Sequence, residues 1–587
     1  MTIWQQLLAS GRVRPVDAAF ARVLLRQTPQ AHPLALAGAA LASQALAQGH
    51  AAFDPALDDG SITPWPDPAQ WQQAWRTAAW IDWPDDPRVP GDPQLPLVAE
   101  FGLLYLRRYR EAEVGLAGHL RRLSATSSLS GADDRLASII GTLFADGDPQ
   151  DRQWQAAQAA LQHPVLLITG GPGTGKTTTI ARILLLHIAQ RLLHDRPAPR
   201  IALAAPTGRA ADRMLYSLQQ AALQWSRHPS IAAEWLAQLP ARAGTVHRLL
   251  GMAPGRVQPH HHAGQPLQAD LVVVDEASML DLPLMAQLAA ALADGTRLIL
   301  LGDRDQLPSV EAGNVLAALD DVAADAAEHA DADVDAASPL HAVHLLRNRR
   351  QTDDLQLQPL TDAVRRGDAD AALQVLESGQ LAGVQWLPTV TDAVLDHPLL
   401  APCWQLWRSL GTLTDPAEAL AAATQARLLT VLRHGPFGAA GCNAAIEARL
   451  AGMQHAPFHP GRLLQITENS PRHGLFNGDV GICLPDADGR LQAWFGHGPA
   501  LRAHGLSGLP AHDSAYASTV HKAQGSEFDR VWVLLPPHDA RVLGRELLYT
   551  ALTRARRSVC LLATPDVLAA CIHRSQQRVS GLRQRLR

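Results

Sequence analysis

Short apolar runs separated by polar turns recur through the middle of the chain. Four of them, at residues 165–168, 201–205, 271–274 and 297–301, have the length of buried strands, and stretches with helical periodicity lie between them. Strands that alternate with helices build a doubly wound parallel sheet whose ligand site lies at the carboxyl ends of the strands. The pattern therefore predicts an α/β unit over residues 165–316.

A second group of apolar runs, at residues 427–432, 530–535 and 558–563, predicts another sheet whose strands lie far apart in the sequence. Between the first two of these runs, three segments have the composition of short β-strands: residues 463–469, 475–484 and 490–495. The dipeptide Asn477-Gly478 among them is typical of a tight turn. We expect a small β-barrel inserted into a second α/β unit.

The N-terminal quarter of the chain has a helical pattern and carries no catalytic motif. Apolar residues have helical spacing at 3–8, 16–25 and 34–46, and a further helix is expected over 97–110. Five tryptophans lie in the Pro/Asp-rich stretch before the last of these: Trp65, Trp71, Trp75, Trp80 and Trp83. Two interpretations stay open: a helical domain whose tryptophans fill its own core, or a module that docks on a partner protein through aromatic anchors.

Changes in composition divide the chain into three parts. We expect an N-terminal helical partner-docking domain at 1–145, a first lobe at 146–340 with a small insertion around 225–268, and a second lobe at 341–587 with a β-rich insertion around 455–515. Residues 126–150 have the composition of a linker. The Ala/Asp-rich residues 319–338 have that of a solvated insertion.

Composition and charge exclude several classes of protein. The net charge of the 587-residue chain is −5, so a nucleic-acid partner would have to be bound in local clefts, because no global positive field exists. The five cysteines are scattered without a C-x-x-C spacing, which favours reduced thiols in a cytoplasmic protein and argues against a zinc site. The first residues lack the apolar core of a signal peptide, and no run reaches the roughly 18 apolar residues of a membrane span.

A glycine-rich segment, GGPGTGKTTT, follows the first predicted strand and precedes a predicted helix. Its residues match the P-loop pattern G-x-x-x-x-G-K-[ST]. Glycines let backbone N–H groups point at phosphate oxygens, the helix N-terminus adds partial positive charge, and the lysine reaches the β and γ phosphates. We predict that ATP is bound here by Gly170, Gly171, Pro172, Gly173, Thr174, Gly175, Lys176, Thr177 and Thr178.

Lysine is almost absent from the chain. Of the 51 lysines and arginines, only Lys176 and Lys522 are lysines. Arginine does not replace lysine where a compact, flexible ammonium group is needed. One of the two lies in the P-loop, and the second, in the segment STVHKAQGSEF, therefore also calls for a functional explanation.

Polar residues at the tips of later strands supply further chemistry. Asp275 and Glu276 follow the third strand, where Asp275 can hold Mg²⁺ together with the Thr177 hydroxyl and Glu276 can orient an attacking water. Gln306 follows the fourth strand and is placed to touch the γ-phosphate. Buried carboxylates are costly without a partner, and Mg²⁺ is such a partner.

Other candidates carry weaker signals. Arg350 and Arg554 are candidate γ-phosphate contacts, and the amide of Gln153 can read the adenine edge. Thr207 and Arg209 follow a strand and suit a nucleic-acid phosphate. Taken alone, Gln153 and the arginines around Arg350 could equally be solvated surface residues.

Seven motifs occur in one order over about two thirds of the chain. They are GGPGTGKTTT, APTGRAA, TVHRLLG, VVVDEAS, GDRDQLPSVEAGNV, STVHKAQGSEF and YTALTRAR. This set resembles superfamily-1 helicases of the RecD type, the alpha chain of exodeoxyribonuclease V. The resemblance is dense from Gln153 to Arg556 and loose before that, and the insertion at 319–338 matches no part of it.

The resemblance implies two RecA-like P-loop lobes with ATP and Mg²⁺ between them, an SH3-like insertion in the second lobe and an N-terminal helical domain. It implies that Gln153 contacts adenine, that Thr177 and Asp275 bind Mg²⁺, and that Glu276 is the catalytic carboxylate. It also implies that Gln306, Arg350 and Arg554 contact the γ-phosphate. Contact with DNA is implied for Thr207, His247, Thr519, His521 and Lys522, and Arg209 is added to them for its position after a strand.

The function that the resemblance implies is 5′-to-3′ movement on single-stranded DNA, within a bacterial heterotrimer with RecB- and RecC-type subunits that repairs double-strand breaks by recombination. No spacing in the sequence shows polarity. We see no nuclease constellation, because a lysine-dependent nuclease site has no lysine available, so cutting is expected of a partner subunit. Two alternatives remain: a stand-alone helicase of the long RecD type, and a non-motor scaffold whose ATP site switches assembly.

Overall fold

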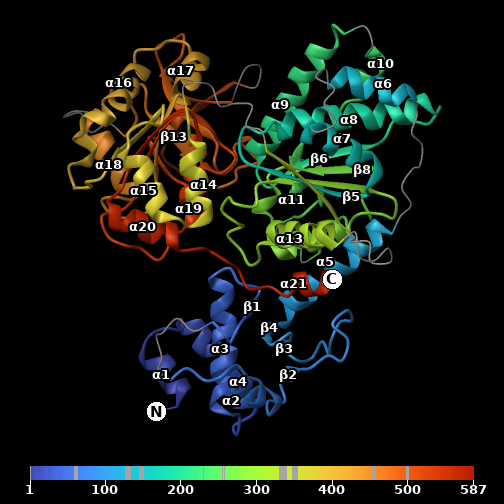
Figure 1. Cartoon of the computed structure of the whole chain (residues 1–587). Coiled ribbons are helices and arrows are strands. Elements are labelled where there is room, and N and C mark those ends of the chain that lie inside the picture. Colours follow the sequence, from blue (N-terminus) through green and yellow to red (C-terminus); the bar gives the residue numbers. More distant parts are fainter. Residues whose placement is uncertain are drawn as a thin grey trace.

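The computed structural model shows two large lobes side by side above a smaller N-terminal part (Figure 1). The structure describes all residues except 1, 58–63, 126–133, 145–150, 229–230, 254, 257, 330–339, 347–354, 451–456 and 497–500. Within the described residues, no helix is both long and apolar enough to cross a membrane.

The N-terminal part combines helices with a small sheet. Its helices are α1 (Ile3–Ala9), α2 (Pro15–Gln27), α3 (Pro33–Ala47) and α4 (Pro68–Arg76). Its strands are β1 (Ala52–Phe53), β2 (Ile81–Asp82), β3 (Leu97–Glu100) and β4 (Leu103–Leu106), in the order β1-β4-β3-β2. The expected helix at 97–110 is therefore wrong: a hairpin stands there, and α5 (Arg107–Ser124) begins only after it. The apolar run 97–106 is short enough to suit either structure, and Gly102, with φ +78°, allows the hairpin turn.

The core of this part is aromatic. Trp71 and Trp75 are fully buried, and the ring of Phe53 meets that of Trp71 edge to face with 5.3 Å between the ring centres. Trp80 belongs to the same buried cluster. These contacts favour the interpretation that the tryptophans fill the domain's own core.

The first lobe is built on a parallel sheet, as the sequence predicted, and this sheet has six strands where the sequence indicated four. Its strand order is β10-β5-β9-β8-β6-β7. The strands are β5 (Val165–Gly170), β6 (Ile201–Ala205), β7 (Gly244–Thr245), β8 (Leu271–Val274), β9 (Arg297–Gly302) and β10 (His341–Leu345). The helices are α6 (Asp134–Leu143), α7 (Arg152–Gln162), α8 (Lys176–Leu193), α9 (Gly208–Trp225), α10 (Ala233–Ala237), α11 (Val246–Leu249), α12 (Leu282–Ala290) and α13 (Val315–His329).

Three segments of this lobe differ from expectation. The sequence placed 341–345 in the second lobe, but β10 pairs with β5 in the first sheet. Part of the supposed linker at 126–150 is the helix α6, which packs on α8. Part of the supposed solvated insertion at 319–338 is α13, where Leu319 and Val322 are buried in the core. The apolar stripe of α13 is not obvious in the sequence because the segment is rich in alanine. The rest of the supposed insertion, residues 330–338, lies outside the described residues.

The second lobe holds another parallel sheet, in the order β11-β20-β19-β12-β18. Its strands are β11 (Val384–Leu387), β12 (Ala426–Thr430), β18 (Ala517–Thr519), β19 (Phe528–Leu534) and β20 (Ala555–Leu562). Its helices are α14 (Gln358–Arg366), α15 (Ala369–Glu377), α16 (Ala401–Leu410), α17 (Pro416–Ala423), α18 (Ala439–Leu450), α19 (Arg545–Leu552) and α20 (Pro565–His573).

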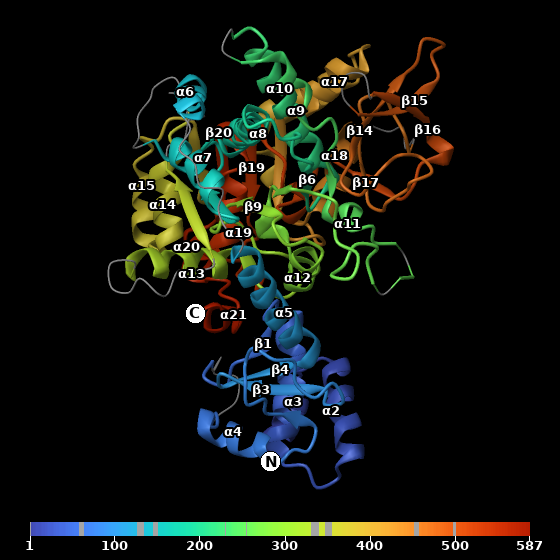
Figure 2. The same ribbon diagram turned by 90° about the vertical axis from the view of Figure 1, so that its right-hand side faces the viewer.

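The expected β-rich insertion is a separate antiparallel sheet, in the order β16-β15-β14-β13-β17 (Figure 2). Its strands are β13 (Leu463–Ile466), β14 (Val480–Pro485), β15 (Leu491–Phe495), β16 (Arg502–Gly505) and β17 (His512–Ser514).

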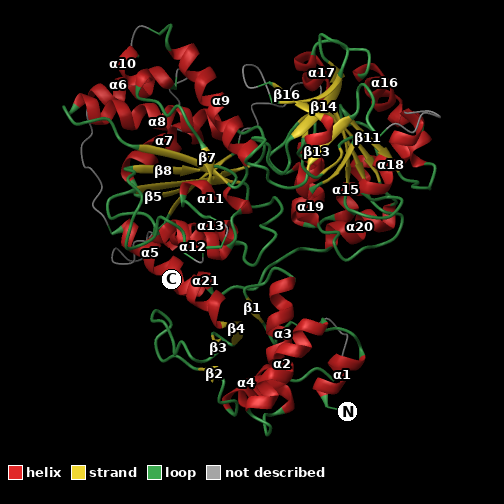
Figure 3. Ribbon diagram, turned by 180° about the vertical axis from the view of Figure 1, so that it is seen from behind, coloured by secondary structure: helices red, strands yellow, loops and turns green. Residues whose placement is uncertain are grey.

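The C-terminal end leaves the second lobe and returns to the other two parts. Helix α21 (Leu582–Leu586) packs against α5 and α13, so the end of the chain lies beneath the first lobe (Figure 3). Leu582 and Leu586 are buried in the same cluster as α12. No motif in the sequence indicates this return.

Candidate active site between the lobes

The P-loop has the backbone geometry that phosphate binding requires. Strand β5 is buried along its whole length, and the turn after it leads directly into α8. Gly173 and Gly175 have φ of +83° and +84°, in the left-handed region that glycine adopts without strain. Gly175 is also the N-cap of α8, so the N-terminal N–H groups of that helix open toward the loop.

The side chains of the loop are held inward. The Lys176 ammonium donates to the carbonyl oxygen of Gly170 at 2.5 Å and to that of Gly171 at 3.1 Å. The Thr174 hydroxyl donates to the Gly171 oxygen at 2.8 Å. A cavity of about 190 Å³ opens at this loop, and Lys176, Thr177 and Thr178 line it. A phosphate at the cavity wall would meet backbone N–H groups, an ammonium and a hydroxyl.

Gln153 packs directly against this loop from α7. Its side-chain amide donates to the Thr174 carbonyl at 2.9 Å, and its amide oxygen accepts from Arg182 at 3.0 Å. A Cβ at Gly175 would overlap the Gln153 amide nitrogen, so this position requires glycine. Gln153 thus supports the loop in addition to lining the cavity.

The two predicted carboxylates line the same cavity, directly after β8. Burial raises the pKa of Asp275 above its usual range; the Glu276 carboxylate adds to this, and the Lys176 ammonium opposes it. Glu276 has φ +53°, a left-handed conformation that costs a non-glycine residue on the order of 1–2 kcal/mol. The Asp275 carboxylate and the Thr177 hydroxyl supply the hard oxygen ligands that suit Mg²⁺.

Gln306 connects the cavity to the second lobe. Its amide donates to the Asp303 carboxylate at 3.1 Å, and the Tyr549 hydroxyl of α19 donates to the same oxygen of Asp303 at 3.1 Å. The next backbone N–H, that of Leu307, donates to the Thr550 hydroxyl at 2.8 Å. A change at Gln306 therefore reaches α19 through one shared carboxylate.

Arg554 approaches the cavity from the second lobe. It lies between α19, which ends at Leu552, and β20, which begins at Ala555. Its side chain is 2% exposed, and it donates to the carbonyl oxygens of Thr550 and Ser526 at 3.1 and 3.3 Å. Arg554 lines the cavity that the P-loop lines. The other candidate, Arg350, lies outside the described residues.

Sequence reasoning missed the ion pairs that join the lobes around this cavity. Arg213 of α9 pairs with Glu527 of the second lobe, and both line the cavity. Arg365 of α14 pairs with Asp305, with 2.7 Å between its Nε and a carboxylate oxygen. This second pair lines a neighbouring cavity of about 180 Å³ on the other side of the P-loop turn. The partners are separated by 60 residues or more, so no local pattern marks them.

The predicted nucleic-acid residues of the first lobe have mixed environments. Thr207 caps α9, its hydroxyl accepting from the Ala210 N–H at 3.2 Å. Arg209 donates to the Ser526 hydroxyl at 2.6 Å, so its guanidinium contacts the second lobe in this arrangement. His247 is exposed on α11. Beside it, the Arg248 guanidinium lies over the Phe476 ring of the β-rich insertion, 4.9 Å from its centre.

The predicted nucleic-acid residues of the second lobe lie in one short segment. The Thr519 hydroxyl accepts from the Lys522 N–H at 3.3 Å. Lys522, half-exposed, extends its ammonium to the Asp513 carboxylate at 3.1 Å. Burial lowers the pKa of His521, and the nearby Arg578 lowers it further.

The P-loop comes from one parallel-sheet lobe and Arg554 from another, so only the two lobes together complete the cavity. That arrangement defines a two-lobed P-loop NTPase of the helicase class. Family models agree: residues 153–312 match an AAA domain, 514–562 a UvrD-like helicase C-terminal domain, and 9–105 the N-terminal domain of the RecBCD enzyme subunit RecD.

Individual relatives make the assignment specific. The RecBCD enzyme subunit RecD of Mycolicibacterium smegmatis is 36% identical over 557 residues, covering 93% of each chain. That of Mycobacterium tuberculosis is 38% identical, covering 89% of this chain and 85% of the other. The chain belongs to the RecD family, and it is an ATP-dependent DNA helicase.

More distant matches were also found. The ATP-dependent RecD2 DNA helicase of Deinococcus radiodurans is 31% identical, over 78% of this chain but 54% of that protein. A solved structure of Bacteroides Pif1 bound to ssDNA is 15% identical, covers 70% of this chain and 91% of the other, and has a TM-score of 0.37, too distant a likeness to carry an argument.

Proposed function

We propose that this chain is the 5′-to-3′ translocating subunit of a RecBCD-type helicase–nuclease, with RecB- and RecC-type subunits as partners and the ends of broken duplex DNA as substrate. The relatives that align over nearly their whole length carry the RecBCD subunit name. The single observation that carries a motor function is Arg554, a second-lobe arginine that lines the P-loop cavity of the first lobe. The polarity rests on the family resemblance alone.

The chemistry assigned to the cavity follows from its walls. We assign the phosphates of ATP to the N-terminus of α8 and Lys176, and Mg²⁺ to Thr177 and Asp275, where its charge would offset the cost of burying a carboxylate. Glu276 would orient the attacking water. We assign to Arg554 and Arg350 the neutralisation of charge on the γ-phosphate; arginines supplied in this way contribute on the order of 10³–10⁵ in rate.

Coupling to movement would run through Gln306. Loss of the γ-phosphate would change the Gln306 contact, and Asp303 would pass the change to Tyr549 in the second lobe. The two lobes would then change their relative position, and each in turn would hold the DNA strand. Contact with the strand is assigned to Thr207, Arg209, His247, Thr519, His521 and Lys522. Because such contacts go to the backbone, binding should tolerate any sequence and weaken with salt.

The remaining parts are assigned to assembly and to the path of the strand. We assign the N-terminal domain, about residues 1–145, to docking on a partner subunit, and the sheet β13–β17 to an SH3-like insertion near the strand. Nuclease activity is assigned to a partner, since both lysines of the chain are already accounted for. A reduced bacterial cytoplasm suits five cysteines that are all buried and unpaired.

A stand-alone motor is the second candidate. The Deinococcus RecD2 helicase aligns with most of this chain, but the alignment covers 54% of that longer protein. The relatives that carry the RecBCD subunit name are instead covered over 93% and 85% of their length, which favours the subunit role. Gel filtration with and without RecB- and RecC-type subunits separates the two: a subunit moves into the larger complex, whereas a stand-alone helicase does not.

Unwinding of tailed duplexes tests the proposal. The chain, alone and in the reconstituted complex, is given duplexes with only a 5′ or only a 3′ single-stranded tail. We expect ATP-dependent strand separation from the 5′ tail alone, provided that a partner motor of opposite polarity is inactivated in the complex. Unwinding from the 3′ tail by the purified chain would overturn the polarity.

The matched control is Lys176→Gln, which removes the ammonium from the phosphate site. It should abolish DNA-stimulated ATP hydrolysis and leave the melting temperature within a few degrees of the parent. A Lys176→Gln protein that still hydrolyses ATP would exclude the motor function and favour the scaffold alternative.

A further inference from the structure

Three segments from three parts of the molecule meet below the active site. The first is the turn Gly49–Ala51 of the N-terminal part, and the second is the loop Ser309–Gly313 of the first lobe. The third is residues 578–579, which we call the strap, on the way from the second lobe to α21. The Gly313 N–H donates to the Gly49 carbonyl at 2.9 Å, and the Ala51 N–H donates to the Val579 carbonyl at 2.8 Å.

Arg578 is the central contact of this junction. One nitrogen of its guanidinium donates to the carbonyl oxygens of Glu311 and Gly313, at 2.5 and 3.1 Å, and to the Ser309 hydroxyl at 3.3 Å. Burial lowers its pKa to about 10, which leaves it charged at neutral pH. Charge-assisted hydrogen bonds to backbone oxygens fix a loop more firmly than neutral ones do.

The N-terminal part closes the junction from below. Gly49 has φ +86°, and a Cβ placed on it would lie 2.6 Å from the Arg578 guanidinium carbon. The Val579 N–H donates to the His50 ring at 3.0 Å. The guanidinium is therefore confined between the turn of one domain and the loop of another.

Both ends of the strap are anchored. On one side, Arg574 forms an ion pair with Asp539 in the second lobe, at 2.7 Å. Arg578 follows Arg574 by four positions, and an extended chain of that length spans no more than roughly 14 Å. On the other side, Arg585 contacts the fully buried Glu113 of α5 at 3.2 Å. The second lobe thus cannot move far from this junction while the strap stays bound.

The loop held by Arg578 is the continuation of the segment that carries Gln306. Ser309 follows Gln306 by three residues, and its hydroxyl donates to the Glu311 and Gly313 oxygens at 3.0 Å each. The tip residue, Val310, is 78% exposed, so the core does not fix the loop there. The segment is bonded to α19 at one end, and at the other to Arg578 and to the Leu282 N–H, which donates to the Ala312 carbonyl at 3.2 Å.

We propose that Arg578 is a positioning residue for Gln306, and that through it the seating of the N-terminal part on the lobes controls the rate of ATP turnover. The inference rests on the proposed role of Gln306 in the motor. Releasing the strap would leave the ATP-binding loop intact, because Lys176 and its partners do not touch Arg578. Release should lower the rate of ATP turnover and leave the affinity for ATP unchanged.

Steady-state ATP hydrolysis by the full chain with saturating single-stranded DNA tests this inference. Arg578→Gln should lower kcat about tenfold with the KM for ATP within twofold of the parent. Arg578→Lys, which keeps a cation near the same oxygens, should recover part of the loss. Gly49→Ala, which pushes on the guanidinium from the other side, should lower kcat in the same way and serves as the test if Arg578→Gln does not fold.

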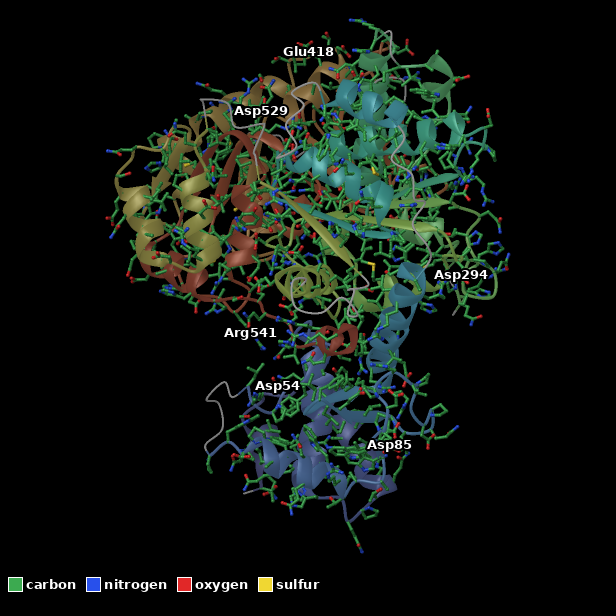
Figure 4. The ribbon with its side chains drawn as sticks, turned by 45° about the vertical axis from the view of Figure 1, so that its right-hand side comes forward. Asp54, Asp85, Asp294, Glu418, Asp529 and Arg541 are labelled. Atoms are coloured by element: carbon green, nitrogen blue, oxygen red, sulfur yellow. The ribbon has the colours of Figure 1, made fainter. Side chains whose placement is uncertain are left out.

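The control variant is Arg541→Gln. Arg541 is an exposed arginine at the edge of the second lobe that faces the N-terminal part, opposite Asp54 (Figure 4), and its charge acts on His50 as that of Arg578 does. It should keep the parental kcat. Wild-type kcat in Arg578→Gln, or an equal loss in Arg541→Gln, would overturn the inference.

A double variant separates this inference from the function on which it rests. If Arg578 acts through Gln306, Arg578→Gln should lower kcat no further in a Gln306→Asn background. If the two substitutions lower kcat by factors that multiply in the double variant, the two residues act independently and the inference is wrong. ATP hydrolysis by Lys176→Gln would exclude the motor function itself. If Lys176→Gln is inactive while Arg578→Gln has the parental kcat, the motor function is retained and only the role of Arg578 is excluded.

Discussion

Arg213, on α9 of the first lobe, and Glu527, at the entry to β19 of the second lobe, form an ion pair across the boundary between the lobes. Glu527 is 6% exposed at its side chain and Arg213 30%, so the pair is largely shielded from water. The outer oxygen of Glu527 accepts from Arg556 at 3.1 Å. Both partners of the pair line the P-loop cavity, so this contact joins the lobes at the candidate ATP site itself.

Replacing Glu527 by glutamine should loosen the two lobes. The change leaves the Arg213 guanidinium partly buried without its counter-charge, and such losses cost about 1–3 kcal/mol when one partner keeps some contact with water. We expect a lower midpoint in urea and a higher KM for ATP.

Arg556→Gln is the control for this pair, because it removes a partner of the same carboxylate whose side chain is 51% exposed. Exposed pairs contribute about 0–1 kcal/mol. Equal destabilisation by the two variants would contradict the importance of the bond between the lobes.

Replacing Arg554 should lower the catalytic rate more than ATP affinity. If Arg554 stabilises charge that develops on the γ-phosphate, Arg554→Gln should lower kcat by on the order of 10³ or more. Arg554→Lys keeps the charge but lacks the planar fork that reaches the Thr550 and Ser526 oxygens, so it should rescue little. ATP hydrolysis with saturating DNA measures both, and a kcat within tenfold of the parent would exclude Arg554 from the reaction.

Patterns local in the sequence predicted much of the active site. Strand β5, the glycine turn and α8 stand where the P-loop pattern placed them, because that motif carries its own backbone geometry. Gln306 follows β9, which pairs with β5, and Asp275 and Glu276 follow β8, the next strand along; the carboxyl ends of these parallel strands share one edge of the sheet. Hydrophobic periodicity predicted four strands of the first sheet and three of the second, and it missed β7, β10, β11 and β18.

Contacts between distant segments could not be predicted. Arg209 suited a phosphate by its position after β6, yet it donates to Ser526 more than 300 residues away. The strap around Arg578 and the buried pair of Arg585 with Glu113 join the two ends of the chain, and neither has a sequence motif. Alanine-rich α13 was mistaken for a solvated segment, since its apolar stripe is made of few large residues.

Acidification should destabilise the first lobe through His187. This residue of α8 is 5% exposed, and burial lowers its pKa to about 3, so the folded state keeps it neutral while the unfolded state binds a proton below about pH 6.5. The unfolded state then binds more protons between these two pKa values, and stability falls as the pH falls. Between pH 7 and pH 5 the loss from His187 should be about 2 kcal/mol.

Urea unfolding at pH 7 and pH 5 measures this effect against His187→Leu, which keeps an apolar side chain of similar size in the core. The variant should lose about 2 kcal/mol less than the parent between the two pH values. His163, whose pKa burial lowers to about 4, remains in both proteins and cancels from the difference. An identical loss in both proteins would contradict the assignment to His187.

Binding of single-stranded DNA should respond in opposite directions to the two members of one surface pair. The Lys522 ammonium lies 3.1 Å from the Asp513 carboxylate, and both side chains are substantially exposed, at 32% and 52%. If Lys522 contacts a phosphate, Lys522→Gln should weaken binding of every sequence alike and reduce the slope of log K against log salt by about one. Asp513→Asn releases the ammonium and removes a negative charge beside the strand, so it should tighten binding. Fluorescence anisotropy at several salt concentrations, with nucleotide absent, measures both; weaker binding in Asp513→Asn would mean that the pair holds the loop and does not compete with DNA.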